Sequence, residues 1–269
     1  RNRIASIAWA DQQRLAEGIV VMVDARVRAN AIEPEHWVRG VRVHLEIVAA
    51  RLVHLEAEQA RGILTGSGVQ WTVTVSGNKN AKFVATSQGG KIFAEVIEPA
   101  DATGRRYLAD SGGDMWFWKP GLSRPVSVSK RQRLSGDAAI GDIASTSYVD
   151  GYKVTGQEDG DVNGEAATVY TMEANSMGDT YAKIKYWVTK AGNLGKKSEF
   201  YAKSGNLVRS STMEYNNKAG GKPFLSKMVV VDGGNTITLS FSDVNLGNFP
   251  ANLFTRENLG GPKDTGPKR

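Results

Sequence analysis

Apolar side chains alternate with polar or small ones along most of this chain, and this spacing of two most strongly constrains its fold. The alternation begins near Gly68 and recurs in short runs as far as Val244. Residues two apart point to the same side of a β-strand, so each run predicts a strand with one apolar face. Clear examples are Trp71-Val73-Val75, Phe93-Glu95-Ile97, Ile184-Tyr186-Val188, Met228-Val230 and Ile237-Leu239-Phe241.

Glycine- and asparagine-rich segments separate these runs and predict tight turns. These residue types accept the positive φ angles that hairpin turns need. Because the connections are short, antiparallel hairpins are favoured over parallel crossovers. The sequence therefore predicts an antiparallel sheet of about eleven strands that must curl and cover its apolar face. The turn segments include Gly89-Gly90, Asn163-Gly164, Ala219-Gly220-Gly221 and Gly233-Gly234-Asn235.

The first 66 residues have a different composition and predict helices. They contain no Lys and all three His residues, and Gly is scarce before Gly62. Apolar residues from Val38 to Leu55 recur at steps of three and four, which makes one helical stripe. An earlier stretch, from about Ile7 to Val27, also has helical spacing. We therefore expect a helical pair at 1–66, serving as a lid or an appendage, a sheet domain at 67–259 and a flexible tail at 260–269.

Composition excludes several classes of protein. The 269 residues include no Cys, which excludes a disulfide framework, thiolate metal sites and a Cys nucleophile. No run of apolar residues is long enough to predict a transmembrane helix. The net charge of +6 is compatible with binding to nucleic acid, with binding to an anionic membrane surface, or simply with a contribution to solubility. The chain starts at Arg1 without a Met, so we expect a processed product.

Catalytic and metal-binding motifs give little support for an enzyme. His36 and His54 would be roughly 27 Å apart along an unbroken helix, too far to share a metal ion. Asp137 and Asp142, in the loop from Lys130 to Ser147, could pair as acid and base, but bracing that loop is the simpler interpretation. The sequence predicts no catalytic residue, no metal and no cofactor.

Lysines beside aromatic residues raise the alternative of a nucleic-acid platform. Lys183 and Lys185 alternate with apolar residues near Tyr186 and Trp187. A solvated sheet face, with Lys residues that discourage edge pairing, explains the same pattern. No RNP-like motif accompanies these residues, so we expect no nucleic-acid partner.

The string Asp114-Met115-Trp116-Phe117-Trp118-Lys119-Pro120 places bulky apolar residues on both faces of one strand. Either the outer face is covered by a helix or the inner face lines a hollow. Additional core beneath the N-terminal helices is an equally good explanation at this stage.

A family resemblance rests on this string and its surroundings. Before it comes Glu98-Pro99-Ala100-Asp101-Ala102-Thr103-Gly104-Arg105, and after it Ser127-Val128-Ser129-Lys130-Arg131-Gln132-Arg133-Leu134-Ser135-Gly136 and Gly141-Asp142-Ile143-Ala144. In order and spacing this succession resembles the bacterial outer-membrane lipoprotein-sorting family, related to the LolA/LolB carrier and receptor. The resemblance covers about Gln70 to Leu259. The long helical segment at the start departs from the family pattern.

The resemblance implies a half-open antiparallel β-barrel of about eleven strands, with helices against its concave face. It implies a periplasmic protein, its signal peptide removed, that shields lipid or lipoprotein acyl chains and passes them towards the outer membrane. It also implies an RND-type transporter or an outer-membrane acceptor as partner, and transient membrane contact. The alternative is an envelope protein-interaction module that regulates such a transporter.

An acyl chain costs about 0.8 kcal/mol per exposed CH₂, so a carrier needs an extended apolar surface. An apolar sheet face supplies one without catalytic residues. The candidate ligand-binding residues are Phe83, Phe93, Met115, Trp116, Phe117, Trp118, Val126, Val128, Ile140, Ile143, Ile184, Tyr186 and Phe200. The strand parity leaves open whether Met115 and Phe117, or Trp116 and Trp118, face the ligand. Candidate rim residues for a lipid headgroup are Arg105, Arg106, Arg124, Arg131 and Arg133.

Overall fold

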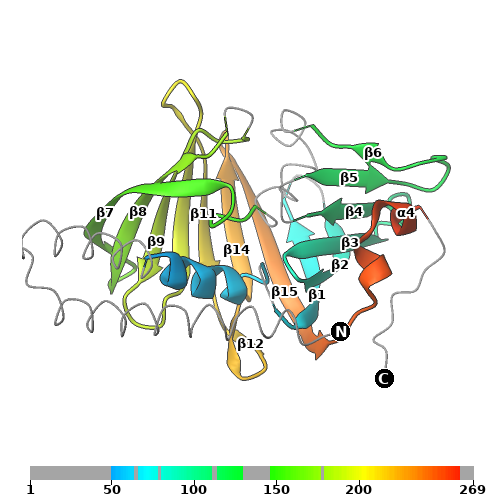
Figure 1. Ribbon diagram of the computed structural model, residues 1–269, viewed down its shortest axis with the longest axis horizontal. Coiled ribbons are helices and arrows are strands. Elements are labelled where there is room, and N and C mark those ends of the chain that lie inside the picture. Colours follow the sequence, from blue (N-terminus) through cyan, green and yellow to red (C-terminus); the bar gives the residue numbers. More distant parts are fainter. Residues whose placement is uncertain are drawn as a thin grey trace, which may run out of the picture. The chain divides into compact units, whose positions relative to one another are not determined.

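One large antiparallel sheet forms the body of the described protein (Figure 1). The computed structural model describes residues 50–63, 66–77, 80–110, 114–129, 146–176 and 179–260. Contacts between residues divide the chain into two compact units, Arg1–Leu55 and Glu56–Arg269. In the second unit, thirteen described strands follow the order β6-β5-β4-β3-β2-β1-β15-β14-β11-β10-β9-β8-β7, and β12 and β13 form a separate hairpin.

The strands are short, apart from β7, β8 and β15. Their bounds are β1 Gly68–Ser76, β2 Ala81–Gln88, β3 Lys91–Glu98, β4 Arg106–Ala109, β5 Met115–Trp118, β6 Val126–Ser127, β7 Tyr152–Val162, β8 Glu165–Ala174, β9 Lys183–Thr189, β10 Gly195–Tyr201, β11 Leu207–Glu214, β12 Asn217–Ala219, β13 Lys222–Phe224, β14 Lys227–Asp232 and β15 Asn235–Gly247. Residues 50–60 are helical. Near the C-terminus, the 3₁₀ helix η2 spans Ala251–Phe254 and α4 spans Arg256–Leu259.

Two-residue turns set the register of several described hairpins. Asn163 and Gly164 join β7 to β8 with φ angles of 56° and 80°, and Val162 pairs directly with Glu165. Two successive positive φ values match the twist of the flanking strands, which explains the Asn-Gly sequence. Gly89-Gly90, Gly220-Gly221 and Gly233-Gly234 close further hairpins with the same pattern. The predicted turns at these positions are confirmed.

The expected fold class is confirmed, with more strands than expected. Among the described residues the sheet ends at β6 on one side and β7 on the other, so it is not closed into a barrel. Thirteen strands replace the expected eleven or so. Strands as short as β4, β5 and β6 contain too few residues for alternation to mark each of them separately.

The sheet has two faces that are covered by different segments. On the first, here called the helix face, Ala60 O accepts a hydrogen bond of 2.8 Å from Leu225 N. Gly62 lies against the rings of Trp71 and Phe224 on the same face. Residues 56–63 are therefore part of the sheet unit, although the sequence places them with the N-terminal helices.

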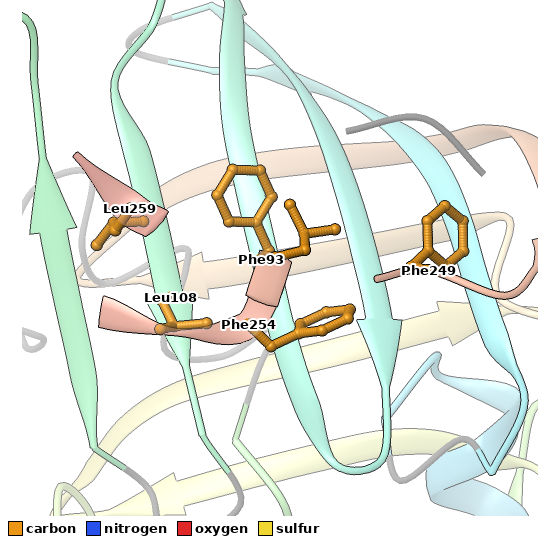
Figure 2. Close-up of a cluster of buried hydrophobic side chains, with 6 residues drawn as sticks. Phe93, Leu108, Phe249, Phe254 and Leu259 are labelled. Carbon is orange, nitrogen blue, oxygen red and sulfur yellow. The ribbon is translucent and has the colours of Figure 1, made fainter. Parts of the chain in front are cut away.

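The opposite face, here called the C-terminal face, is covered by the end of the chain. Phe93 of β3 and Leu108 of β4 are buried against Phe249, Leu253, Phe254 and Leu259 (Figure 2). Arg106 of β4 donates to the carbonyl of Leu259 at 3.2 Å, which fixes α4 to the sheet. Residues 249–259 thus act as a strap over β3 and β4.

We expect this strap to contribute substantially to stability. Leu253 is 1% exposed, so Leu253→Ala should lower the free energy of unfolding by about 2–5 kcal/mol through the cavity it leaves. Leu246→Ala is the matched control, because Leu246 is 55% exposed and should change stability by less than about 0.5 kcal/mol. Urea denaturation of both variants measures the difference. Equal effects would contradict the strap's role.

Candidate functional site

The helix face contains a closed region in which the protein's own aromatic rings are packed together. Tyr148, Tyr181, Tyr186 and Phe200 are each fully buried. The ring centroids of Tyr148 and Tyr186 are 4.9 Å apart, and those of Tyr181 and Phe200 are 4.7 Å apart. Ile184, on β9 next to Phe200, is also fully buried. This region has the close packing of a protein core.

A buried ion pair holds the covering segments of the closed region together. Arg61 Nη1 donates to Glu58 Oε1 at 2.6 Å, and the Tyr148 amide donates to Glu58 Oε2 at 3.0 Å. The Arg61 guanidinium lies 4.1 Å from the centroid of the Tyr148 ring. Arg61 Nη1 and Nη2 also both donate to the carbonyl of Thr146, each at 3.5 Å. These contacts tie residues 58–61 to residues 146–148.

Burial and the opposite charge of the partner act in opposing directions on the pKa of each member of this pair. Burial raises the pKa of Glu58, while the charge of Arg61 and the hydrogen bond from Tyr148 oppose that rise. Burial alone would lower the pKa of Arg61, but the Glu58 carboxylate raises it above its ordinary value. Each charge is thus kept in the interior by the other.

The helix face also contains an open region, over β2 to β6. Tyr107 of β4 pairs directly with Phe117 of β5, and Phe117 pairs with Val126 of β6. The Tyr107 ring centroid lies 5.1 Å from that of Phe117 and 6.4 Å from that of Phe83 on β2. The three rings are only partly buried, and Val126 is 44% exposed. We call Phe83, Tyr107, Phe117 and Val126 the aromatic row.

The structure divides the candidate ligand-binding residues between the two faces. Met115, Phe117, Val126 and Val128 share the helix face with Phe83, and Met115 is buried. Ile184, Tyr186 and Phe200 lie on that face too, but in the closed region.

Three other candidates, Phe93, Trp116 and Trp118, lie on the C-terminal face and pack in its cluster. This answers the parity question in favour of Met115 and Phe117 as the pair that shares the helix face.

The candidate rim arginines are also separated. Arg106 is buried on the C-terminal face, where it donates to Glu95 Oε2 at 3.3 Å and stacks on Trp118. Its position differs from the expected rim because the Glu95 carboxylate lies directly opposite on β3. Arg105 is partly buried and Arg124 is exposed.

Several sequence predictions lie outside the described residues. These are Ile140, Ile143, Arg131, Arg133, the pair Asp137 and Asp142, the helical stripes before residue 50 and the tail after Gly260.

Sequence reasoning missed Tyr107 and the pair of Glu58 and Arg61. Tyr107 lies between Arg106 and Leu108, and its strand of four residues gives little alternation to read. The sequence did contain a usable signal. Only a short connection separates the strands of Tyr107 and Phe117, and a hairpin of this kind would place the two rings side by side. Glu58 and Arg61 are three apart on a helical segment, a spacing typical of exposed pairs rather than buried ones.

The part of the chain that the structure describes has neither a metal-binding cluster nor a membrane-spanning helix. It contains no group of three or more His, Asp and Glu side chains that could hold a metal ion. None of its helices has the length and apolar character needed to cross a bilayer.

Comparisons with known proteins agree with this architecture. A protein-family model described as "Uncharacterized protein" matches residues 89–260. A LolA superfamily protein from Nitrosomonas europaea has a TM-score of 0.66 and 24% identity, covering 77% of this chain and 98% of that one. The chain belongs to the family of that model, and its fold is LolA-like.

Two further solved structures resemble this LolA-like protein. An outer membrane lipoprotein-sorting protein domain from Vibrio parahaemolyticus has a TM-score of 0.65 and 21% identity, covering 80% of this chain and 97% of that one. A DUF1329 family protein from Desulfovibrio piger has a TM-score of 0.63 and 19% identity, covering 79% and 98% of the two chains. None of the curated proteins matches the sequence.

The buried ion pair makes a prediction about pH. Arg61→Met leaves the Glu58 carboxylate buried without its cation, so we expect a loss of about 3–5 kcal/mol in the free energy of unfolding at pH 7. The pKa of Glu58 then rises further above its unfolded value. A carboxyl with a raised folded pKa favours folding at low pH and loses that contribution as the pH rises. The deficit should therefore shrink towards pH 4, as measured by urea denaturation.

Two controls separate this effect from general destabilisation. Adding Glu58→Gln to Arg61→Met should remove the pH dependence of the deficit, because no buried carboxyl remains. Lys227→Met breaks the exposed pair with Glu214 and should cost about 0–1 kcal/mol. A deficit in Arg61→Met that is the same at pH 4 and pH 7 would show that Glu58 is not its source.

Proposed function

We propose that this LolA-like protein is a carrier of lipid or lipoprotein acyl chains and that the aromatic row is where a chain binds. The observation that carries the proposal is the contrast within the helix face. The closed region is filled by the protein's own rings, whereas Phe83, Tyr107, Phe117 and Val126 remain partly or largely accessible. An accessible apolar row on the face where the sheet keeps its core is typical of a ligand-binding surface.

The chemistry of the row suits reversible binding. Aromatic and aliphatic side chains offer contacts without fixed direction, and each CH₂ of a chain removed from water contributes about 0.8 kcal/mol. Such contacts hold a chain without covalent chemistry and release it to a second apolar surface. The proposal therefore assigns no catalytic residue. Two of the similar structures are named as a LolA superfamily protein and a lipoprotein-sorting domain, which supports the same class of ligand.

The proposal extends to the place and the direction of transfer. A carrier of acyl chains between two membranes works in the periplasm, where free chains would otherwise be exposed to water. Its acceptor would be an RND-type transporter or an outer-membrane protein, reached by transient contact with the membrane surface.

Val126 and Val231 offer a matched test. Both are exposed valines, at 44% and 43%, but Val126 lies in the aromatic row and Val231 on β14 faces away from the helix face. A carboxylate in the row must be desolvated when an apolar chain binds, so Val126→Asp should weaken binding of a fluorescent fatty acid at least tenfold. Val231→Asp should leave the affinity unchanged. Fluorescence titration measures both.

Folding is checked by circular dichroism and thermal unfolding, which should match the wild-type protein because both sites are exposed. Phe117→Ala provides a second variant that removes apolar area without adding charge, and it should also weaken uptake. If folded Val126→Asp and Phe117→Ala bind the probe as well as the wild type does, the aromatic row is not the binding surface.

A further inference from the structure

A positively charged side chain lies beside the aromatic row, immediately before β4 begins. Val96 N donates to Arg105 O and Gly104 N donates to Val96 O, both at 2.9 Å, so Gly104 and Arg105 together oppose Val96. Gly104 has a φ of 81°, which makes this a bulge that begins with a left-handed glycine. Val96 also pairs with Phe83. Arg105 is therefore on the helix face, two residues before Tyr107.

The turn between β5 and β6 brings two further cations to the same side of the row. Lys119 follows Phe117 by two residues, and Arg124 precedes Val126 by two. The Leu122 amide donates to the carbonyl of Lys119 at 3.0 Å, so the turn begins at Lys119.

A contact places this turn beside the bulge. A Cβ atom added at Gly104 would lie 3.3 Å from Pro120 Cγ. Arg105, Lys119 and Arg124 thus belong to neighbouring backbone segments. They lie near the ends of β4, β5 and β6, along one side of the aromatic row, and are here called the cationic end.

The cationic end is not neutralised by carboxylates in the described part of the chain. Arg105 donates to the backbone carbonyl of Asp101 at 3.3 Å, and none of the three cations forms an ion pair with a described side chain. The carboxylate of Glu98, the last residue of β3, lies 3.8 Å from Lys82 instead. Several other lysines of the sheet unit are paired, such as Lys190 with Asp159 at 2.6 Å.

We propose that the ligand is an anionic amphiphile, with its carboxylate or phosphate headgroup at the cationic end and its chain packed on the aromatic row. This inference rests on the proposed function, because it assigns the polar end of the same ligand. Arginine presents a fork of N–H donors that matches carboxylate and phosphate oxygens. Because the cations are exposed, they contribute less to affinity than the chain does, and they set the direction in which it lies.

A pair of probes that differ only in charge tests this assignment. A fluorescent fatty acid and its methyl ester present the same chain with and without a carboxylate. We expect the wild-type protein to bind the acid about tenfold more tightly than the ester at low salt, and the preference to fall as the salt concentration rises. The triple variant R105Q/K119Q/R124Q should bind the ester normally and lose the preference for the acid.

The matched control is K153Q/K218Q/K222Q, which removes three exposed charges on β7 and the β12–β13 hairpin. It lowers the net charge equally, so it should keep the preference for the acid. Equal affinity for acid and ester in the wild type, or a preference that survives in R105Q/K119Q/R124Q, overturns the inference while ester binding still supports a carrier. If neither probe binds the wild-type protein, the proposed function fails as well.

Discussion

The need to cover both faces of an open antiparallel sheet governs this structure. Each strand contributes apolar side chains to at least one face, and exposing them to water is costly. Residues 56–63 and 146–149 cover the closed region of the helix face, and residues 249–259 cover part of the C-terminal face. In the described chain this cover stops short of the aromatic row. Among the described residues, the candidate site is thus the part of the helix face that the covering segments leave accessible.

The cover of the closed region is fixed by polar contacts as well as by packing. Apolar surfaces can slide past each other at little cost, whereas a buried carboxylate and guanidinium need defined partners. Glu58 and Arg61 find theirs in each other, in the Tyr148 amide and in the Thr146 carbonyl. These contacts require one position of the covering segments over Tyr186 and Phe200. Phe83, Phe117 and Val126 of the aromatic row present apolar side chains, whose contacts have no fixed direction, and this suits a surface that exchanges its contents.

The sequence predicted the sheet well because alternation and turn chemistry are local. Asn163-Gly164 and Gly233-Gly234 predict hairpins because these residues accept the positive φ angles that such turns need. The candidate site was harder to predict. Met115 and Phe117 are separated from Trp116 and Trp118 by alternation, but alternation does not say which pair faces the helices and which faces the C-terminal strap. Arg106 and Arg105 likewise differ only in parity, yet one is buried against Glu95 and the other lies beside the aromatic row.

The sequence by itself determined an antiparallel sheet with tight turns, because strand period and turn residues act over a few neighbours. It also marked Phe83, Phe117 and Val126 as apolar positions. Only the tertiary structure decided that Tyr107 joins them, that Phe93 is covered by Phe254, and that Arg105 lies near the turn with Lys119. The first and third depend on strand register, and the second joins segments more than a hundred residues apart. No local pattern encodes which distant segment covers which face.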